Sequence, residues 1–256
     1  LGSNGDVNGN TLTYASWNWK ANGQGSSNTD GTINSTYTSA STTSGFSIVQ
    51  FTGTGANATV GHGLGVAPSV IITRPTSQSG TWRVYNEALG NTQYLTLNTT
   101  AAQGTGSTMW NGSPTNQVFT LGSSSDTNGS GVTFTSYCFA EKQGFSKMGK
   151  YTGTGNVDGA FVYTGFKPAW VLIKNTTATE AWFLYDNKRG YNGAMKALFP
   201  DEEAAEGGAA DNIDLLSNGF KLKTAGAILN SATTFSYIAF AAAPFVGTNN
   251  VPATAR

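Results

Sequence analysis

An internal repeat with a spacing of about one hundred residues constrains the fold of this chain more than any other feature. The sequence FTGTG at residues 51–55 returns as YTGTG at residues 151–155, and WRVYN at residues 82–86 returns as WFLYD at residues 182–186. Both pairs are 100 residues apart. Self-similarity at a fixed spacing predicts two copies of one structural unit.

A third, partial copy opens the chain. Residues 1–20 match residues 121–140 at a constant spacing of 120, beginning with LGS at residues 1–3 and again at residues 121–123. We therefore expect residues 1–20 to be the C-terminal strands of a preceding, truncated repeat unit. They would occupy the sheet position that residues 121–140 occupy in the first complete copy.

The segment between the partial copy and the first complete copy has a different composition. Residues 21–44 are dominated by Gly, Ser, Thr and Asn, and their only large apolar side chains are Ile33 and Tyr37. So little apolar surface predicts an extended or flexible linker. The expected organisation is therefore a preceding unit at 1–20, a linker at 21–44, a first repeat at 45–143, a second repeat at 144–245 and a C-terminal tail at 246–256.

Within each copy the apolar pattern is typical of strands. Short runs of Val, Ile, Tyr, Phe and Thr are bounded by Gly, Asn, Pro and Ser. The pattern predicts an all-β protein with two tandem antiparallel β-sandwich lobes of jelly-roll-like form. The one helix candidate is residues 200–206, where a proline and acidic residues suit a helix N-terminus, although Gly207 and Gly208 would end it within two turns. The strands expected in the first copy are residues 45–51, 58–61, 69–74, 82–86, 94–98, 117–121 and 132–141.

Composition excludes several classes of protein. The 14 Lys and Arg residues balance 14 Asp and Glu residues, so no net charge attracts nucleic acid or an anionic membrane. A single cysteine, Cys138, allows no internal disulfide, and a single histidine, His62, allows no His-rich metal site. No apolar run approaches the length of a membrane helix, so no membrane insertion is expected.

Motifs for catalysis and metal binding are weak. The GHGLG sequence at residues 61–65 lacks the order of a nucleotide-binding loop, and His62 is interpreted as a loop histidine with local hydrogen bonds. DVNGN at 6–10 and DTNGSG at 126–131 begin like calcium loops, yet their twelfth positions hold aromatic residues, so Asx-type turns are favoured. The acidic segment 201–214 could hold calcium, although a solvated loop is the better interpretation. We expect no catalytic residues, metal or cofactor.

Candidate binding residues lie where the two copies differ, because recognition usually resides in loops on a shared scaffold. An unpaired tryptophan and a basic-aromatic loop offer ring stacking and charge-assisted hydrogen bonds to a polar ligand. The alternative interpretation is that Trp110 caps a core and that the basic pair is a solvated turn. The candidates are Trp110 and Asn111 in the first copy, and Lys188, Arg189, Tyr191 and Asn192 in the second copy.

Several motifs together resemble a repeat domain of uncharacterised function in bacteriophage virion proteins, chiefly tail fibres of marine and related phages. The endings PFVG at 244–247 and PATAR at 252–256 look like that family's C-terminus. The motifs that carry the resemblance are FTGTG at 51–55, TVGHGLGVAP at 59–68, YCFAE at 137–141, FVYTGFKP at 161–168 and LSNGFKL at 216–222.

The resemblance implies a non-enzymatic virion part, commonly homotrimeric and exposed to the host. On this basis we expect the distal part of a tail fibre that contacts a host surface glycan or receptor. It would be made in the bacterial host cytoplasm and joined to other virion proteins through a more N-terminal region. One alternative is a capsid-associated head fibre or decoration protein with a structural role. A secreted carbohydrate-active enzyme is a remote alternative, because no carboxylate pair is evident.

Overall fold

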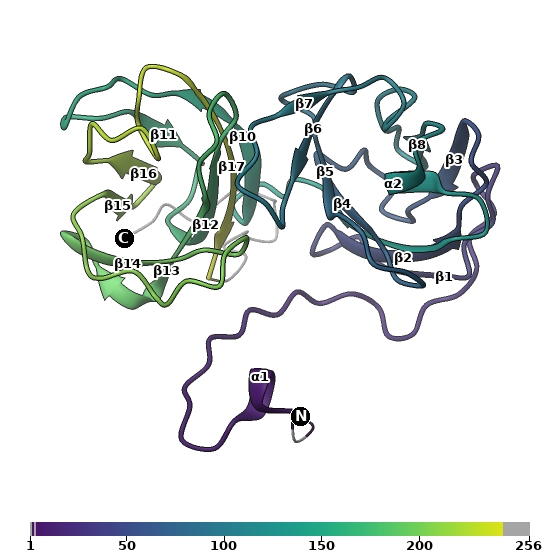
Figure 1. Cartoon of the computed structure of the whole chain (residues 1–256), viewed down its shortest axis with the longest axis horizontal. Coiled ribbons are helices and arrows are strands. Elements are labelled where there is room, and N and C mark those ends of the chain that lie inside the picture. The colour runs from purple at the N-terminus through teal and green to yellow at the C-terminus, as the bar shows by residue number, and fades with distance from the viewer. Residues whose placement is uncertain (1, 3, 243–256) are drawn as a thin grey trace.

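The computed structural model describes residues 2 and 4–242, and within them the expected all-β fold is confirmed (Figure 1). Helix in these residues is limited to two single turns, α1 (Gly5–Asn8) and α2 (Ser125–Asn128). Both turns fall on the segments for which Asx-type turns were favoured. The expected C-terminal tail at 246–256 and the ending motifs at 244–247 and 252–256 lie outside the described residues.

The first lobe consists of a large and a small antiparallel sheet. The large sheet has seven strands in the order β1-β2-β9-β4-β5-β6-β7, and the small sheet pairs β3 with β8. All seven strands expected in this copy are present to within two residues at each end. The strands are β1 (Tyr37–Ser41), β2 (Phe46–Thr52), β3 (Ala58–Gly61), β4 (Val70–Pro75), β5 (Arg83–Asn86), β6 (Gln93–Thr96), β7 (Gly104–Thr105), β8 (Val118–Leu121) and β9 (Thr133–Phe139).

The second lobe repeats this arrangement. Its large sheet has the order β10-β17-β12-β13-β14, which reproduces the order β2-β9-β4-β5-β6 of the first lobe. The register is also repeated, because Phe51 pairs with Phe134 and Tyr151 pairs with Phe235. A small sheet has the order β11-β16-β15. The strands are β10 (Ser146–Thr152), β11 (Phe161–Tyr163), β12 (Pro168–Asn175), β13 (Trp182–Tyr191), β14 (Ala194–Leu198), β15 (Ile213–Leu216), β16 (Gly219–Leu222) and β17 (Thr234–Ala241).

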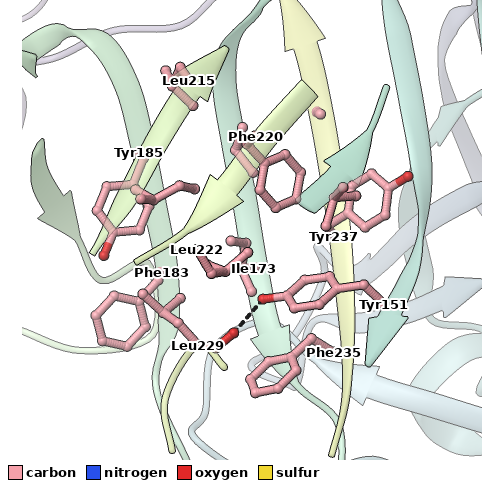
Figure 2. Packing of buried hydrophobic residues seen from close by; sticks show 14 of the residues in the cluster. Tyr151, Ile173, Phe183, Tyr185, Leu215, Phe220, Leu222, Leu229, Phe235 and Tyr237 are labelled. Atoms are coloured by element: carbon pink, nitrogen blue, oxygen red, sulfur yellow. Dashed lines mark hydrogen bonds between the residues drawn. The ribbon is translucent and has the colours of Figure 1, made fainter. Parts of the chain in front are cut away.

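Alternation along the strands separates two kinds of core. In β2 the side chains of Val49 and Phe51 point into the core of the first lobe, whereas Phe46 and Ile48 face the second lobe. The two large sheets therefore bury their other faces against each other. Figure 2 shows the separate core of the second lobe, where the hydroxyl of Tyr151 donates to the carbonyl oxygen of Leu229 at 2.6 Å.

Residues 1–20 do not form the expected strands. The helical turn α1 lies 120 residues before α2, as the repeat requires, but residues 9–20 belong to no strand. The equivalent strand β9 is hydrogen-bonded between β2 and β4, whereas no described strand pairs with residues 9–20 on either side. We call residues 9–20 the arm; in Figure 1 it is drawn in purple and runs below the lobes toward their junction.

Residues 21–44 are not a free linker. Strand β1 pairs along β2, and Ile33 is buried and bridges Val60 of β3. The backbone of Gly31 packs so closely on Thr59 that a Cβ at Gly31 would overlap the Thr59 carbonyl oxygen. Backbone hydrogen bonds and small residues hold this segment to the sheet, so a rule based on large apolar side chains missed it. We call residues 26–41 the strap.

The helix expected at residues 200–206 is also absent, and this segment forms a turn followed by coil. Its acidic side chains instead form hydrogen bonds and ion pairs with neighbouring strands. Asp201 accepts a hydrogen bond from the amide of Trp182 at 3.0 Å, and Glu206 forms ion pairs with Arg189 and Lys196. With two glycines directly after it, the segment is too short to repay the cost of helix nucleation.

Candidate functional site

A groove of about 890 Å³ lies between the arm and the two lobes. The arm supplies one wall, and strands β12, β13 and β17 of the second lobe supply the other. The turn between β1 and β2 closes one side with Ser41, Thr43 and Ser44. The side chains used below come from Trp17, Trp19 and Lys20 of the arm, and from Trp170, Asp186, Asn187, Lys188 and Arg189 of the second lobe.

Aromatic rings fix the arm at the junction of the lobes. The ring of Trp19 lies 6.0 Å from Phe139 of the first lobe, and 5.5 and 5.2 Å from Trp170 and Phe240 of the second, measured between centroids. All three contacts are edge-on, the geometry that aromatic quadrupoles favour. The neighbouring Trp17 lies under the guanidinium group of Arg189, at 5.6 Å from its ring centroid.

The charged wall is built by the long strand β13. The Oδ1 atom of Asp186 accepts the amides of Lys188 and Arg189 at 2.9 and 3.1 Å, and its Oδ2 atom accepts Arg189 Nε at 2.7 Å. Arg189 also donates from Nη1 to Glu206 at 3.0 Å. Hydrogen bonds from Lys196 and Arg189 lower the pKa of Glu206. Asp186 is therefore a buried structural acid that shapes the hairpin.

Two lysines in the groove differ from Arg189. Lys20 and Lys188 are exposed, and in the described part of the chain neither forms an ion pair. They come from opposite walls, Lys20 from the arm and Lys188 from β13. The groove therefore combines partly exposed indole rings with unpaired ammonium groups and the side-chain amide of Asn187.

The structure places only part of the second predicted loop at this groove. Lys188 and Arg189 line it, but Tyr191 and Asn192 do not. Tyr191 is 74% exposed on the hairpin. The side chain of Asn192 accepts the amide of Leu215 at 2.9 Å and donates to its carbonyl oxygen at 3.1 Å. Asn192 thus anchors β15 to the hairpin, so a structural role accounts for its hydrogen bonds.

The structure places Trp110 in a core, as the alternative interpretation expects, and not at a binding surface. Its side chain is 1% exposed and packs edge-on against Tyr85 in the core of the first lobe, at 5.7 Å between centroids. The loop that carries it runs beside β8, where Thr120 donates to the carbonyl oxygen of Gly112 at 2.5 Å. Trp110 fills core space on a loop in the place where the second lobe uses a strand, β15. Asn111 is exposed but lies outside the groove.

Sequence reasoning did not select Trp17, Trp19, Lys20 or Trp170 as binding residues. Trp17 and Trp19 match Tyr137 and Phe139 of the first copy, and such a match indicates core or interface positions. The available signal was that these large aromatic side chains lie outside the two complete copies of the repeat. His62, by contrast, makes the expected local hydrogen bonds, with its Nδ1 accepting the amide of Leu64 at 3.1 Å.

Metal ligands do not gather at the groove or in the acidic segment. Asp211 and Asp214 both pair with Lys223, at 2.9 and 3.4 Å. Across residues 2 and 4–242, no three His, Cys, Asp or Glu side chains lie close enough together to hold a metal ion. Likewise, no helix in this range is long and apolar enough to cross a membrane.

Fold and groove together define a two-lobed all-β repeat protein with a groove at the lobe junction. Residues 1–244 match the family described as Domain of unknown function (DUF7483), so the chain belongs to this family. Searches of curated proteins and of solved structures gave no match.

Proposed function

We propose that this protein is a non-enzymatic bacteriophage virion protein, the distal part of a tail fibre or similar appendage, which binds glycan on the host cell surface. The motif resemblance to tail-fibre repeat domains supports the virion assignment. The observation that carries the binding assignment is the groove, where indole rings gather beside polar and cationic side chains. In particular, β13 has ten residues where the equivalent β5 has four, so the groove lies where the copies differ.

The chemistry of the groove suits a saccharide. The apolar face of a pyranose ring stacks on indole rings such as those of Trp17 and Trp170, and sugar hydroxyls accept hydrogen bonds from ammonium and amide groups. Binding at this groove proceeds without cleavage. Glycoside hydrolysis normally needs two carboxyl groups, and Asp186 is the only carboxylate among the described residues that line the groove. That carboxylate is already bound to Arg189.

Self-association is part of the same proposal, because no strand among the described residues pairs with the outer edge of β10 or β11. In the first lobe the strap covers β2 and β3. No strap equivalent precedes β10, and Phe161 and Tyr163 of β11 are 47% and 65% exposed. Apolar surface of this kind is typical of contact surfaces. We assign the exposed surface of β11 to contacts between copies in a homotrimer, because every copy in a closed symmetric assembly makes the same contacts.

Adsorption of virions to host cells tests the binding assignment. Virions that carry Trp17→Ala together with Lys188→Ala should adsorb at least about tenfold more slowly, since several weak sites act together on one particle. Virions carrying Asn111→Ala, an exposed change outside the groove, are the matched control. Normal adsorption by the groove variant, with its fold intact by circular dichroism, would overturn glycan binding at this site.

Immunogold labelling of intact particles tests the location. Antibodies raised against the chain should label the tips of tail fibres. Labelling spread over the capsid would contradict the tail assignment and favour a decoration protein. Incubation of the purified chain with host polysaccharide should leave the chain length of the polysaccharide unchanged, and shortening would contradict the non-enzymatic assignment.

A further inference from the structure

The groove carries a charge as well as aromatic rings, and this charge narrows the class of glycan. Its lining residues include three cations, Lys20, Lys188 and Arg189, and one carboxylate, Asp186. Arg189 already has two carboxylate partners, Asp186 at 2.7 Å and Glu206 at 3.0 Å. The charge that remains for a ligand is therefore that of Lys20 and Lys188.

Building on the proposed function, we infer that the groove selects acidic saccharides, whose carboxylate is held between the ammonium groups of Lys20 and Lys188 while a sugar ring lies against Trp17. An ammonium group is a flexible point charge with three donors, which suits a carboxylate at variable positions along a glycan. Charge-assisted hydrogen bonds of this kind are about twice as strong as neutral ones.

The equivalent position in the first lobe gives an internal comparison. There the residue that matches Asp186 is Asn86, and the residue that matches Lys188 is Ala88. Asn86 is 2% exposed and donates to the hydroxyl of Ser236 at 2.8 Å across the lobe junction. The first lobe therefore uses this position to join the lobes. Only the second lobe presents cations there, which is why one acidic-sugar site is expected in each chain.

The salt dependence of binding follows from the exposure of the two lysines. Exposed charges are screened over about 8 Å at physiological ionic strength, so an acidic saccharide should bind less tightly as salt is added. Stacking on an indole ring is not screened in this way. A neutral saccharide in the same groove should therefore show a weak response to salt.

The test is titration calorimetry of the full chain with galacturonate and N-acetylneuraminate oligosaccharides, each compared with its neutral methyl ester. At least one acid should bind about tenfold more tightly than its ester. This difference in affinity should shrink as the salt concentration rises from about 20 to about 300 mM, because salt screens the charges of the two lysines. Lys188→Ala and Lys20→Ala should each abolish most of this preference, while Trp17→Ala should weaken acid and ester alike.

Lys150→Ala is the matched control, because Lys150 is an exposed lysine on β10 outside the groove. Equal binding of acid and ester would overturn the acidic-sugar inference and leave glycan binding intact. If Lys150→Ala reduced the preference for the acid as much as Lys188→Ala does, the acidic-sugar inference would be overturned in favour of non-specific electrostatic attraction. If neither acids nor esters bind, and virions that carry both Trp17→Ala and Lys188→Ala also adsorb normally, the inference and the proposed glycan binding both fail.

Discussion

Two asparagines explain at the residue scale why the TGTG sequence is repeated. In the first lobe Asn128 accepts the amide of Thr54 at 2.8 Å through Oδ1, and its Nδ2 atom donates to two backbone carbonyls at 2.6 and 2.9 Å. In the second lobe Asn230 accepts the amide of Thr154 at 3.0 Å and donates to two carbonyls at 2.7 and 2.8 Å. Each asparagine is fully buried. In each lobe, one asparagine side chain therefore holds the TGTG turn by hydrogen bonds.

Replacing Asn230 by alanine should lower the free energy of unfolding by about 3 kcal/mol, because buried amides and carbonyls would lose their partners. Urea denaturation followed by tryptophan fluorescence measures the change. Asn111→Ala, on the exposed loop of the first lobe, should alter stability by less than about 0.5 kcal/mol. Equal effects of the two substitutions would contradict this account of the turn.

A buried lysine joins the lobes. The side chain of Lys174 in β12 is 0% exposed, and its Nζ atom donates to the carbonyl oxygen of Thr100 in the first lobe at 3.1 Å. The Nζ atom also donates to the backbone carbonyl oxygens of Asn175 and Glu180 in the second lobe, at 2.9 and 2.8 Å. Burial lowers the pKa of Lys174 from 10.5 to about 8, although Asp201 and Glu180 oppose the shift.

This pKa shift predicts a dependence of stability on pH. Between pH 8 and 10.5 the unfolded chain holds the Lys174 proton and the folded chain releases it, so this group's contribution to the free energy of unfolding rises with pH. The unfolding free energy of wild type minus that of Lys174→Met should therefore increase from about pH 7.5 to about pH 10. Urea titrations at several pH values measure this signed difference, and a decrease with rising pH would contradict the shifted pKa.

At the scale of elements, the strap accounts for the main difference between the lobes. It supplies β1, which pairs with β2 from Tyr37 to Ser41, and it places Ile33 on β3. Within residues 4–242 the second lobe has no such element, so β10 and β11 are edge strands of their sheets there. Open edges are commonly protected by lysine, and β10 carries Lys147 and Lys150.

Gly31→Val should detach the strap from β3, because a side chain there would overlap the backbone of Thr59. We expect a loss of about 2 kcal/mol and faster amide hydrogen exchange in β3. Gly208→Val is the matched control, since a Cβ at Gly208 would meet nothing within 4 Å. Unchanged exchange in β3 of the Gly31 variant would argue against the strap as a stabilising element.

The elements also show how far sequence reasoning reaches. The repeat and the alternation of apolar residues located all seven strands of the first copy, because buried strands carry a period that is visible in the sequence. The strap was missed because its contacts are made by backbone and glycine. The strand expected in the arm is absent because a strand needs neighbouring strands, and none of those in residues 4–242 pairs with residues 9–20. The groove forms only because of the path that the arm takes. Of the residues that line the groove, the sequence therefore pointed only to Lys188 and Arg189.

At the scale of the whole molecule, we expect the chain to form a homotrimer. Light scattering at micromolar concentration should give three times the chain mass of 26.6 kDa. Replacing both Phe161 and Tyr163 by serine should yield monomers, because these exposed rings of β11 would form the contact. Tyr191→Ser, also at an exposed tyrosine, should leave the mass unchanged. A stable monomer in the unaltered protein would contradict the prediction.

The two lobes should unfold as one unit, because their large sheets share a core. Trp182 is 1% exposed in this core, and its indole Nε1 donates to the carbonyl oxygen of Thr96 in the other lobe at 2.9 Å. Trp182→Ala removes the ring and the hydrogen bond, at a cost of about 4 kcal/mol. Since both lobes lose packing at once, fluorescence and far-ultraviolet circular dichroism should report one coincident transition in wild type and variant, shifted to lower urea in the variant. If the variant showed two transitions, with one at the wild-type midpoint, the lobes would be stable separately and the shared core would be a contact between independent domains.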